Sequence, residues 1–370
     1  MRLAAEVALS RVSKHNEELC GDAAQVVRTP GETTIILSDG LGSGVKANIM
    51  ATLTTQIASG LLRRKVSIEH VISTIADTLP TCKVRGLAYS TLSILQIRDN
   101  GCASLFEYDS PPAMLFRSDQ LMPIDRQQRQ ICGRQVTEAR FQLEDGDVIL
   151  MVTDGVVHAG VGASFDLGLG EDGLLHFLGS PCSTWTTAEQ LADFTIDIAK
   201  ACYQSQPGDD CTAAAIRIRQ PQIVRVMSGP PLDPKYDAAM VRDLLEIPGA
   251  KRVVCGGTTA QIVGRILGEA IETSLEYVDP RVPPTATLPS IDLTTEGVLT
   301  LNRCYELLRS AAEGEDLPRS QDGAARLARI LWNAEEVMFL VGRSFNQAHA
   351  NLEELMQLAP RQHIITKLAH

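Results

Sequence analysis

Apolar residues in the first 220 positions fall mainly into short runs bounded by Gly, Pro, Asp or Asn, which is typical of β-strands. In other segments the apolar residues recur at helical spacing. Strands mixed with a helical block predict an α+β domain in which helices pack on an antiparallel sheet or a sandwich. The predicted strands are 23–28, 33–37, 89–97, 102–108, 148–152 and 211–218, and the predicted helices are 45–64, 67–79 and 187–203.

The pattern changes near residue 220. The stretch 221–234 is rich in proline and has the composition of a linker, so the domain boundary is predicted there. Beyond it, helical and strand-like segments alternate, which predicts a smaller α/β domain over 235–370 with some parallel pairing. The expected helices are 236–246, 259–267, 297–312 and 323–333, and the expected strands are 252–255 and 335–341.

Composition narrows the class of protein. A chain of 370 residues with 44% hydrophobic and 21% charged residues fits two ordinary globular domains. A net charge of -11 without an extended basic cluster argues against a nucleic-acid partner. Nine cysteines without a Cys-x-x-Cys pair disfavour a disulfide framework and a zinc site, and no apolar stretch is long enough for a membrane span. A cytoplasmic protein with reduced thiols and no membrane partner is therefore expected.

Four acidic sites share one arrangement, in which an aspartate lies where an apolar strand begins or ends. They contain Asp22, Asp39, Asp154 and the pair Asp209-Asp210. One Asp-Gly after a strand is usually a turn, but strand ends can bring several such sites to one edge. Clustered carboxylates repel and need cations, and oxygen ligands select hard divalent ions such as Mg²⁺ or Mn²⁺. Two such ions could activate a water and neutralise a phosphate ester.

The run Ser-Asp-Gly-Leu-Gly-Ser-Gly over 38–44 adds detail to the second of these sites. Its glycines allow close approach of the backbone and ligation by a carbonyl. The run has no Lys-Ser/Thr of a Walker motif, and its glycine spacing differs from the dinucleotide fingerprint. Nucleotide binding at this loop is therefore disfavoured.

The motifs at 38–44, 152–156 (Val-Thr-Asp-Gly-Val) and 208–212 (Gly-Asp-Asp-Cys-Thr), with Cys-Gly-Asp at 20–22, resemble the SpoIIE-type branch of the PPM (type-2C) phosphatases. The resemblance covers about residues 1–220. It implies a type-2C-phosphatase-like β-sandwich flanked by helices, followed here by the smaller α/β domain. It also implies a serine/threonine protein phosphatase that uses two Mn²⁺ or Mg²⁺ ions.

The resemblance also implies a role for each acidic position. Asp39 would touch both metals and, with Asp154, would be catalytic. The carbonyl of Gly40 would help to bind one metal. Asp154 and Asp209 would hold the first metal, and Asp22 would serve the second, directly or through water. Asp210 would orient neighbours or share in ligation.

Two positions depart from the family's pattern. Members commonly carry an acid shortly after the second Asp-Gly, but this region holds His158, which is expected to be a surface or packed side chain. The phosphate-binding basic residue of larger relatives has no clear counterpart, and Lys14 is one candidate.

Helices 45–64 and 67–79 correspond to two helices that can act as a switch in the family. Static scaffold helices are the alternative.

A second candidate site lies in the smaller domain, where Gly256, Gly257, Thr258 and Thr259 open a predicted helix after a strand. Free amides at a helix N-terminus can bind an anion, and the alternative is simple capping by Thr258 or Thr259. This half resembles an extra domain attached to SpoIIE-type phosphatases of anaerobic bacteria. A sensory or partner-docking role is predicted for it.

The predicted function is hydrolysis of phosphoserine or phosphothreonine on a bacterial regulatory protein, by family analogy an anti-sigma-factor antagonist. Two alternatives stay open. One is a non-catalytic regulator with a phosphatase fold, which senses a ligand or partner through the C-terminal domain. The other is a phosphatase of small metabolites. A homodimer is also compatible with the sequence.

Overall fold

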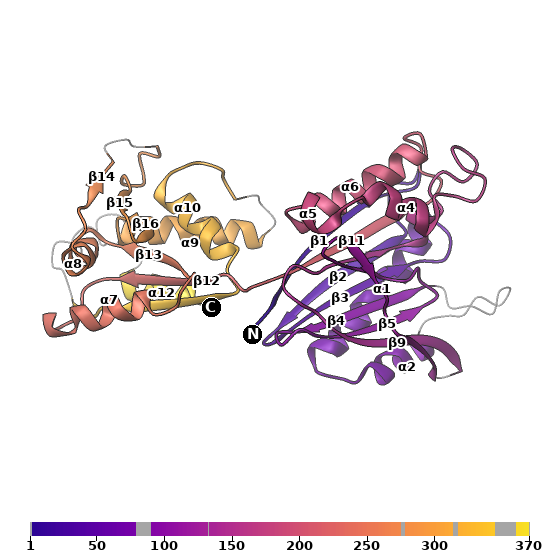
Figure 1. The fold of residues 1–370 in the computed structure, drawn as a ribbon, viewed down its shortest axis with the longest axis horizontal. Coiled ribbons are helices and arrows are strands. Elements are labelled where there is room, and N and C mark those ends of the chain that lie inside the picture. The colour runs from indigo at the N-terminus through magenta and orange to yellow at the C-terminus, as the bar shows by residue number, and fades with distance from the viewer. Residues whose placement is uncertain are drawn as a thin grey trace. The chain divides into compact units, whose positions relative to one another are not determined.

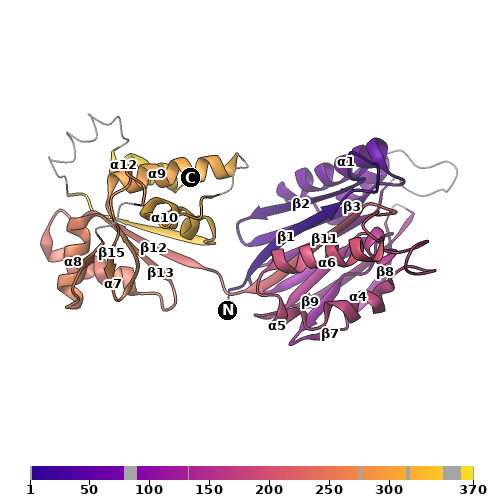
Figure 2. The same cartoon turned by 90° about the horizontal axis from the view of Figure 1, so that it is seen from above.

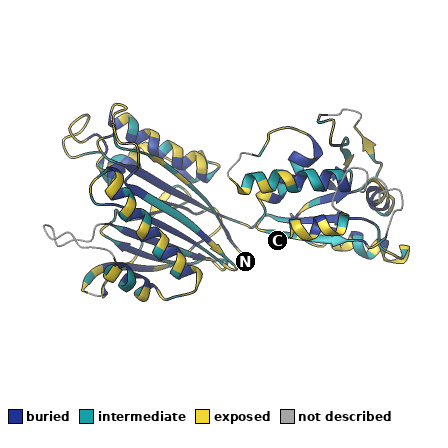
Figure 3. Cartoon of the chain, turned by 180° about the vertical axis from the view of Figure 1, so that it is seen from behind, coloured by how far each residue is buried: buried dark blue, intermediate teal, exposed yellow. Residues whose placement is uncertain are grey.

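The computed structural model describes residues 2–78, 90–131, 133–274, 278–313, 317–344 and 360–369. The chain divides into two compact units, Met1–Gln220 and Pro221–His370 (Figure 1). Each unit has its own sheets and its own hydrophobic clusters. In both, the exposed residues gather mainly on the outer faces of helices and in loops (Figure 3).

The first unit contains two antiparallel sheets. The first sheet has the order β1 (Ala4–Val12), β11 (Cys211–Arg219), β10 (Val148–Val152), β6 (Met114–Arg117) and β7 (Gln120–Met122). The second has the order β2 (Asp22–Thr29), β3 (Glu32–Asp39), β4 (Leu92–Arg98), β5 (Cys102–Tyr108), β9 (Arg134–Gln142) and β8 (Arg126–Ile131).

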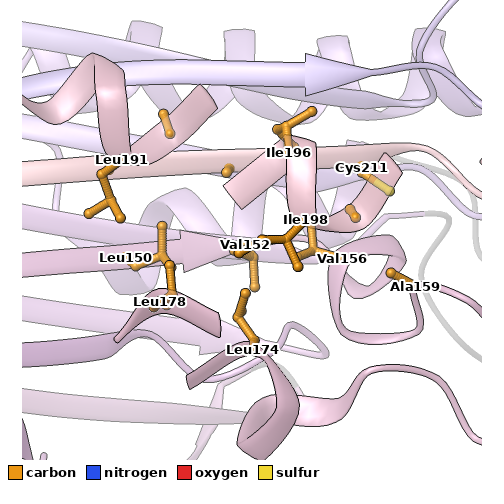
Figure 4. Close-up of a cluster of buried hydrophobic side chains, with 14 of the residues drawn as sticks. Leu150, Val152, Val156, Ala159, Leu174, Leu178, Leu191, Ile196, Ile198 and Cys211 are labelled. Atoms are coloured by element: carbon orange, nitrogen blue, oxygen red, sulfur yellow. The ribbon is translucent and has the colours of Figure 1, made fainter. Parts of the chain in front are cut away.

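Strand β10 shows how the layers pack. Ile149 and Met151 belong to the cluster between the two sheets, whereas Leu150 and Val152 belong to the cluster under the helices. Figure 4 shows Leu150 and Val152 among helix side chains that cover this sheet, which include Leu174, Leu178 and Leu191. Because both faces are covered, the strand is apolar throughout instead of alternating with polar residues.

Helices cover the outer face of each sheet. The helices α1 (Gly44–Arg63) and α2 (Ile68–Thr78) pack on the second sheet. The first sheet is covered by α4 (Gly170–Leu178) and α6 (Ala188–Cys202), together with the short helices α3 (Asp154–Val157) and α5 (Pro181–Thr184). Figure 2 shows α1 and α6 on opposite sides of the sheets. The resulting sandwich flanked by helices agrees with the predicted fold class.

The second unit is built on one six-stranded sheet. Its order is β14 (Glu272–Thr273), β15 (Ala286–Leu288), β16 (Ile291–Thr295), β13 (Lys251–Cys255), β12 (Ile223–Ser228) and β17 (Glu336–Val341). Strands β16, β13, β12 and β17 pair in parallel, whereas β14 and β15 pair antiparallel. The sheet is therefore mainly parallel, where the alternating pattern predicted some parallel pairing.

Helices cover both faces of this sheet. The helices α7 (Asp237–Leu245), which follows the short η1 (Pro234–Tyr236), and α8 (Gly257–Leu267) pack on one face. The other face is covered by α9 (Val298–Ala312), α10 (Gly323–Trp332) and α12 (Arg361–Leu368). This arrangement makes the second unit a small doubly wound α/β domain.

The structure corrects the predicted linker at 221–234. Residues 223–228 form β12, which pairs with β13 on one side and β17 on the other. Val224 and Val226 are fully buried. The prolines precede or follow this strand without interrupting it, so its amides are free to bond to both neighbours.

Other predicted elements are close to those observed. Strand 148–152 and helices 45–64 and 323–333 differ from their observed bounds by at most one residue. The first residue of the predicted strand 89–97 and the last residue of the predicted helix 67–79 belong to the segment 79–89, which lies outside the described residues. Strand β1 was not predicted, because its polar residues break the apolar run.

The described residues contain no helix that is both long enough and apolar enough to cross a bilayer. Seven cysteines in these ranges are free thiols, and five of them are buried: Cys20, Cys202, Cys211, Cys255 and Cys304.

Candidate active site

Two aspartates of the second sheet lie side by side. Asp22 begins β2 and Asp39 ends β3, and the two residues pair across these antiparallel strands. Directly opposed residues place their Cβ atoms about 4.5–5.5 Å apart. The Gly40 amide donates to the Gly21 carbonyl oxygen at 3.2 Å and extends this pairing past the strand ends.

The other sheet contributes the remaining aspartates at the same end of the sandwich. Asp154 follows β10, and Asp210 directly precedes β11. Thr153 joins the two sheets, because its Oγ1 donates to Asp22 Oδ2 at 2.8 Å and accepts from the Thr212 amide at 2.8 Å. Residues far apart in the sequence are thus fixed to one another by a single hydroxyl group.

Burial and repulsion by neighbouring carboxylates raise the pKa values of Asp22, Asp39 and Asp209. Burial, followed by the charges of Asp22 and Asp154, raises the pKa of Asp39 to about 10. Burial is also the main cause that raises the pKa of Asp22 to about 7, and the charge of Asp210 adds to it. The pKa of Asp209 is raised by burial and by Asp154. Ionising all of these neighbouring carboxyl groups therefore costs free energy unless cations neutralise the charge.

Among the residues that the structure describes, two carboxylate oxygens of the cluster, Asp22 Oδ1 and Asp210 Oδ2, are buried and have no hydrogen-bond partner. The other oxygens of these two groups are bonded, to Thr153 and to the Lys14 amide. A buried carboxylate oxygen without a partner is costly, and a hard divalent cation would satisfy it. The donor set therefore fits Mg²⁺ or Mn²⁺.

Within the part of the chain that the structure describes, no group of three His, Cys, Asp or Glu side chains has the arrangement that holds a metal ion. The feature of the cluster that fits a metal ion is the pair of buried oxygens without a partner, and not the spacing of the carboxylates.

Two glycines of the Asp-Gly motifs are required by close packing. A Cβ atom at Gly40 would collide with the backbone of Ala47 in α1, and one at Gly155 would collide with the Asp210 carbonyl. The backbone after Asp39 is thus packed against α1, and the backbone after Asp154 is packed against the Asp209-Asp210 segment.

Tyr203 was not anticipated from the sequence. This buried residue follows α6, and its hydroxyl lies 3.1 Å from the carbonyl oxygen of Gly155 and 3.2 Å from that of His158. It fixes α3, and with it Asp154, to the segment that leads to Asp209. A Tyr five residues before the Gly-Asp-Asp motif is the signal that could have identified it.

The two flanking positions also have defined places. His158 Nδ1 lies 3.9 Å from Asp154 Oδ2 in a half-exposed pair, which contributes little to stability. Lys14 lies close enough to Asp209 for its charge to lower the pKa of that carboxyl, against the larger effect of burial. Lys14 therefore places a cation beside the aspartates.

The second candidate site differs from its predicted capping. Gly256, with φ 117°, is the N-cap of α8, and no side chain caps this helix. The hydroxyl of Thr259 accepts instead from the Gly229 amide at 2.9 Å and joins α8 to the segment after β12. Gly257 and Thr258 are exposed at the helix N-terminus. Capping by Thr258 or Thr259 is therefore wrong, and anion binding there stays a prediction.

A family model described as stage II sporulation protein E (SpoIIE) matches residues 29–219, which is more than half of the chain. The match includes the Asp39, Asp154 and Asp209-Asp210 motifs and leaves out the second unit. No curated protein is similar enough to count as a match.

Solved structures support the same fold. One comprises the PP2C phosphatase domain and a fragment of the regulatory domain of SpoIIE from Bacillus subtilis, with 19% identity and a TM-score of 0.52, over 59% of this chain and 64% of that one. Another comprises the RsbU and RsbW domains of Rv1364c from Mycobacterium tuberculosis, with 17% identity and a TM-score of 0.50, over 65% of this chain and 68% of that one. At these identities the likeness shows a common fold.

Proposed function

Since this chain belongs to the SpoIIE family, we propose that its first unit is a metal-dependent phosphatase for phosphoserine or phosphothreonine on a regulatory protein. The observation that carries the proposal is the pair of buried carboxylate oxygens that have no partner among the described residues, within a cluster of aspartates from both sheets. A binding module without catalysis has little reason to retain groups that repel one another so strongly.

The proposed metal ligands are Asp22, Asp39, the carbonyl of Gly40, Asp154, Asp209 and Asp210. When bound, Mn²⁺ or Mg²⁺ would supply positive charge for the phosphate and a water of lowered pKa. The chain's own contribution is to hold these groups in place. Thr153 orients Asp22, and Tyr203 orients the backbone beside Asp154.

Lys14 is the proposed cationic contact for the substrate phosphate. Its charge acts on Asp209, and its amide bonds to Asp210 Oδ1 at 3.0 Å. A lysine at this position would attract a dianionic phosphate ester as a point charge. Loss of this charge would then weaken substrate binding more than it slows the chemical step.

The proposed substrate is a phosphorylated regulatory protein, with an anti-sigma-factor antagonist as the form suggested by family membership. The second unit is proposed to sense a ligand or to dock a partner, with Gly256, Gly257, Thr258 and Thr259 as its candidate anion-binding residues. A phosphatase of small metabolites would instead hydrolyse such compounds faster than phosphoproteins.

The test is phosphate release by the full chain from p-nitrophenyl phosphate and from a phosphoserine peptide, with Mn²⁺ and with chelator. We expect Mn²⁺-dependent release that is lost in Asp39→Asn. Asp125→Asn is the matched control, because this exposed aspartate lies outside the cluster. Binding of the phosphopeptide without any turnover would overturn the proposal in favour of a non-catalytic regulator.

A further inference from the structure

The loop 160–168, between α3 and α4, exposes three large apolar side chains a few residues after Asp154. Val161 is 48% exposed, Phe165 is 39% exposed and Leu167 is 89% exposed. Asp166 is the only charged residue of this loop. Apolar side chains gathered at one exposed place often mark a binding surface.

The loop is held by its own backbone. The Gly160 carbonyl accepts from the amides of Ala163 at 3.0 Å and Phe165 at 2.9 Å. The Leu169 amide donates to the Ala159 carbonyl at 2.9 Å and closes the base of the loop. The exposed side chains therefore project from a fixed scaffold, so a partner would not have to order the loop in order to bind.

The same contacts place the loop at the aspartate end of the sandwich. Ser164 Oγ donates to the Cys202 carbonyl at 2.7 Å, which anchors the loop to the end of α6. The next residue, Tyr203, bonds to the carbonyls of Gly155 and His158 beside Asp154. The loop and the proposed catalytic residue thus share one anchor.

We propose that loop 160–168 docks apolar residues that flank the phosphorylated serine or threonine of a protein substrate. This inference rests on the proposed function and specifies its substrate class. Val161, Phe165 and Leu167 offer apolar surface to such residues, whereas the loop offers no cation to an acidic flank and Asp166 repels one. Phosphosites with neighbouring Leu or Phe are therefore preferred over sites with neighbouring polar or acidic residues.

The experiment measures kcat/KM of the full chain with Mn²⁺ on two phosphoserine peptides. One carries Leu and Phe beside the phosphoserine, and the other carries Ser and Asn at the same positions. We expect the apolar peptide to be the better substrate. Replacing two of the three exposed apolar side chains in one variant (Phe165→Ser with Leu167→Ser) should lower the ratio of the two kcat/KM values about tenfold.

Leu121→Ser is the matched control. Leu121 is 50% exposed on β7 and pairs with Phe116, which in turn pairs with Val148 at the start of β10. Asp154 follows the opposite end of β10, so this substitution removes a comparable apolar side chain far from the site. The ratio for Leu121→Ser should equal that of the unmodified chain.

The possible results separate the role of loop 160–168 from the proposed phosphatase function. An equal ratio in the double variant and the unmodified chain would overturn the role of the loop, while hydrolysis of p-nitrophenyl phosphate would leave the proposed function standing. No hydrolysis of either peptide or of p-nitrophenyl phosphate would overturn both. Conversion of a dimer to a monomer by the double variant, with no change in the ratio, would assign the loop to contacts between copies and overturn the proposal.

Discussion

The two units bury different polar groups at their strand ends. Among the described residues of the first unit, the ends of antiparallel strands from two sheets bring together carboxylates whose oxygens Asp22 Oδ1 and Asp210 Oδ2 have no hydrogen-bond partner. In the second unit the described strands bury hydroxyl groups without a partner instead, Ser228 Oγ in β12 and Thr294 Oγ1 in β16, and after β13 Thr259 is bonded to Gly229 while Thr258 is exposed. A buried carboxylate without a partner requires a cation, whereas an uncharged hydroxyl group does not.

The largest expected effect comes from the aspartates. Asp39→Asn or Asp154→Asn should each lower phosphate release by more than about 100-fold, because even residues that only orient a metal ligand contribute about 10–100-fold. Thr258→Ala, the counterpart in the second unit, should leave the rate on p-nitrophenyl phosphate unchanged. Rates with saturating Mn²⁺ check both. An equal loss in Thr258→Ala would break the distinction between the units.

A second pair of variants compares the two threonines that bond across elements. Thr153→Val removes the donor to Asp22 and the acceptor of the Thr212 amide. It should weaken Mn²⁺ binding about 10–100-fold. Thr259→Val removes only the acceptor of the Gly229 amide. It should cost about 1 kcal/mol in unfolding free energy and leave Mn²⁺ binding unchanged.

Calorimetric titration with Mn²⁺ and urea denaturation measure these two quantities. Unaltered Mn²⁺ binding in Thr153→Val would mean that the aspartates need no support from the opposite sheet.

A third pair concerns glycines. Gly155→Ala should lower the free energy of unfolding by about 1–3 kcal/mol, because its Cβ atom would collide with the Asp210 backbone. Gly257→Ala should instead raise it by about 0.4–1 kcal/mol, since nothing lies within 4 Å of a Cβ atom there and the position is helical. Urea denaturation checks both signs. Equal effects would contradict the closer packing at Gly155 than at Gly257.

The smallest expected effect is that of Tyr203→Phe. The substitution keeps the buried ring and removes the hydroxyl that lies beside the Gly155 and His158 carbonyls. It should cost about 0.5–1.5 kcal/mol in unfolding free energy. Thermal unfolding measures this loss, with the more exposed Tyr236 of the second unit as the control in Tyr236→Phe. A loss as large in the control would show that the hydroxyl of Tyr203 has no special part.

The sequence predicts elements well where burial leaves a simple pattern. Strand β10 was predicted with its observed bounds, because both of its faces are covered and all five residues are apolar. Strand β12 was missed, because its flanking prolines resemble a linker when its neighbours in the sheet are unknown. Local composition cannot show that two parallel strands pair with it.

Tertiary contacts that local sequence does not show also limit what can be predicted of the active site. The aspartates were predicted from recurring motifs, which need no knowledge of the packing. Thr153, Thr212 and Tyr203 were not, since their bonds join residues more than 40 positions apart in the sequence. Tertiary contacts decide which hydroxyl groups support a carboxylate, and one sequence does not reveal them.

We propose that the first unit hydrolyses a phosphate ester only when divalent cations are bound to its aspartates. The most direct test is the initial rate of phosphate release from a phosphoserine peptide by the full chain, first after chelation and then after Mn²⁺ is restored. We expect the rate to disappear with chelator and to return with Mn²⁺. A full rate that persists in excess chelator would contradict this account.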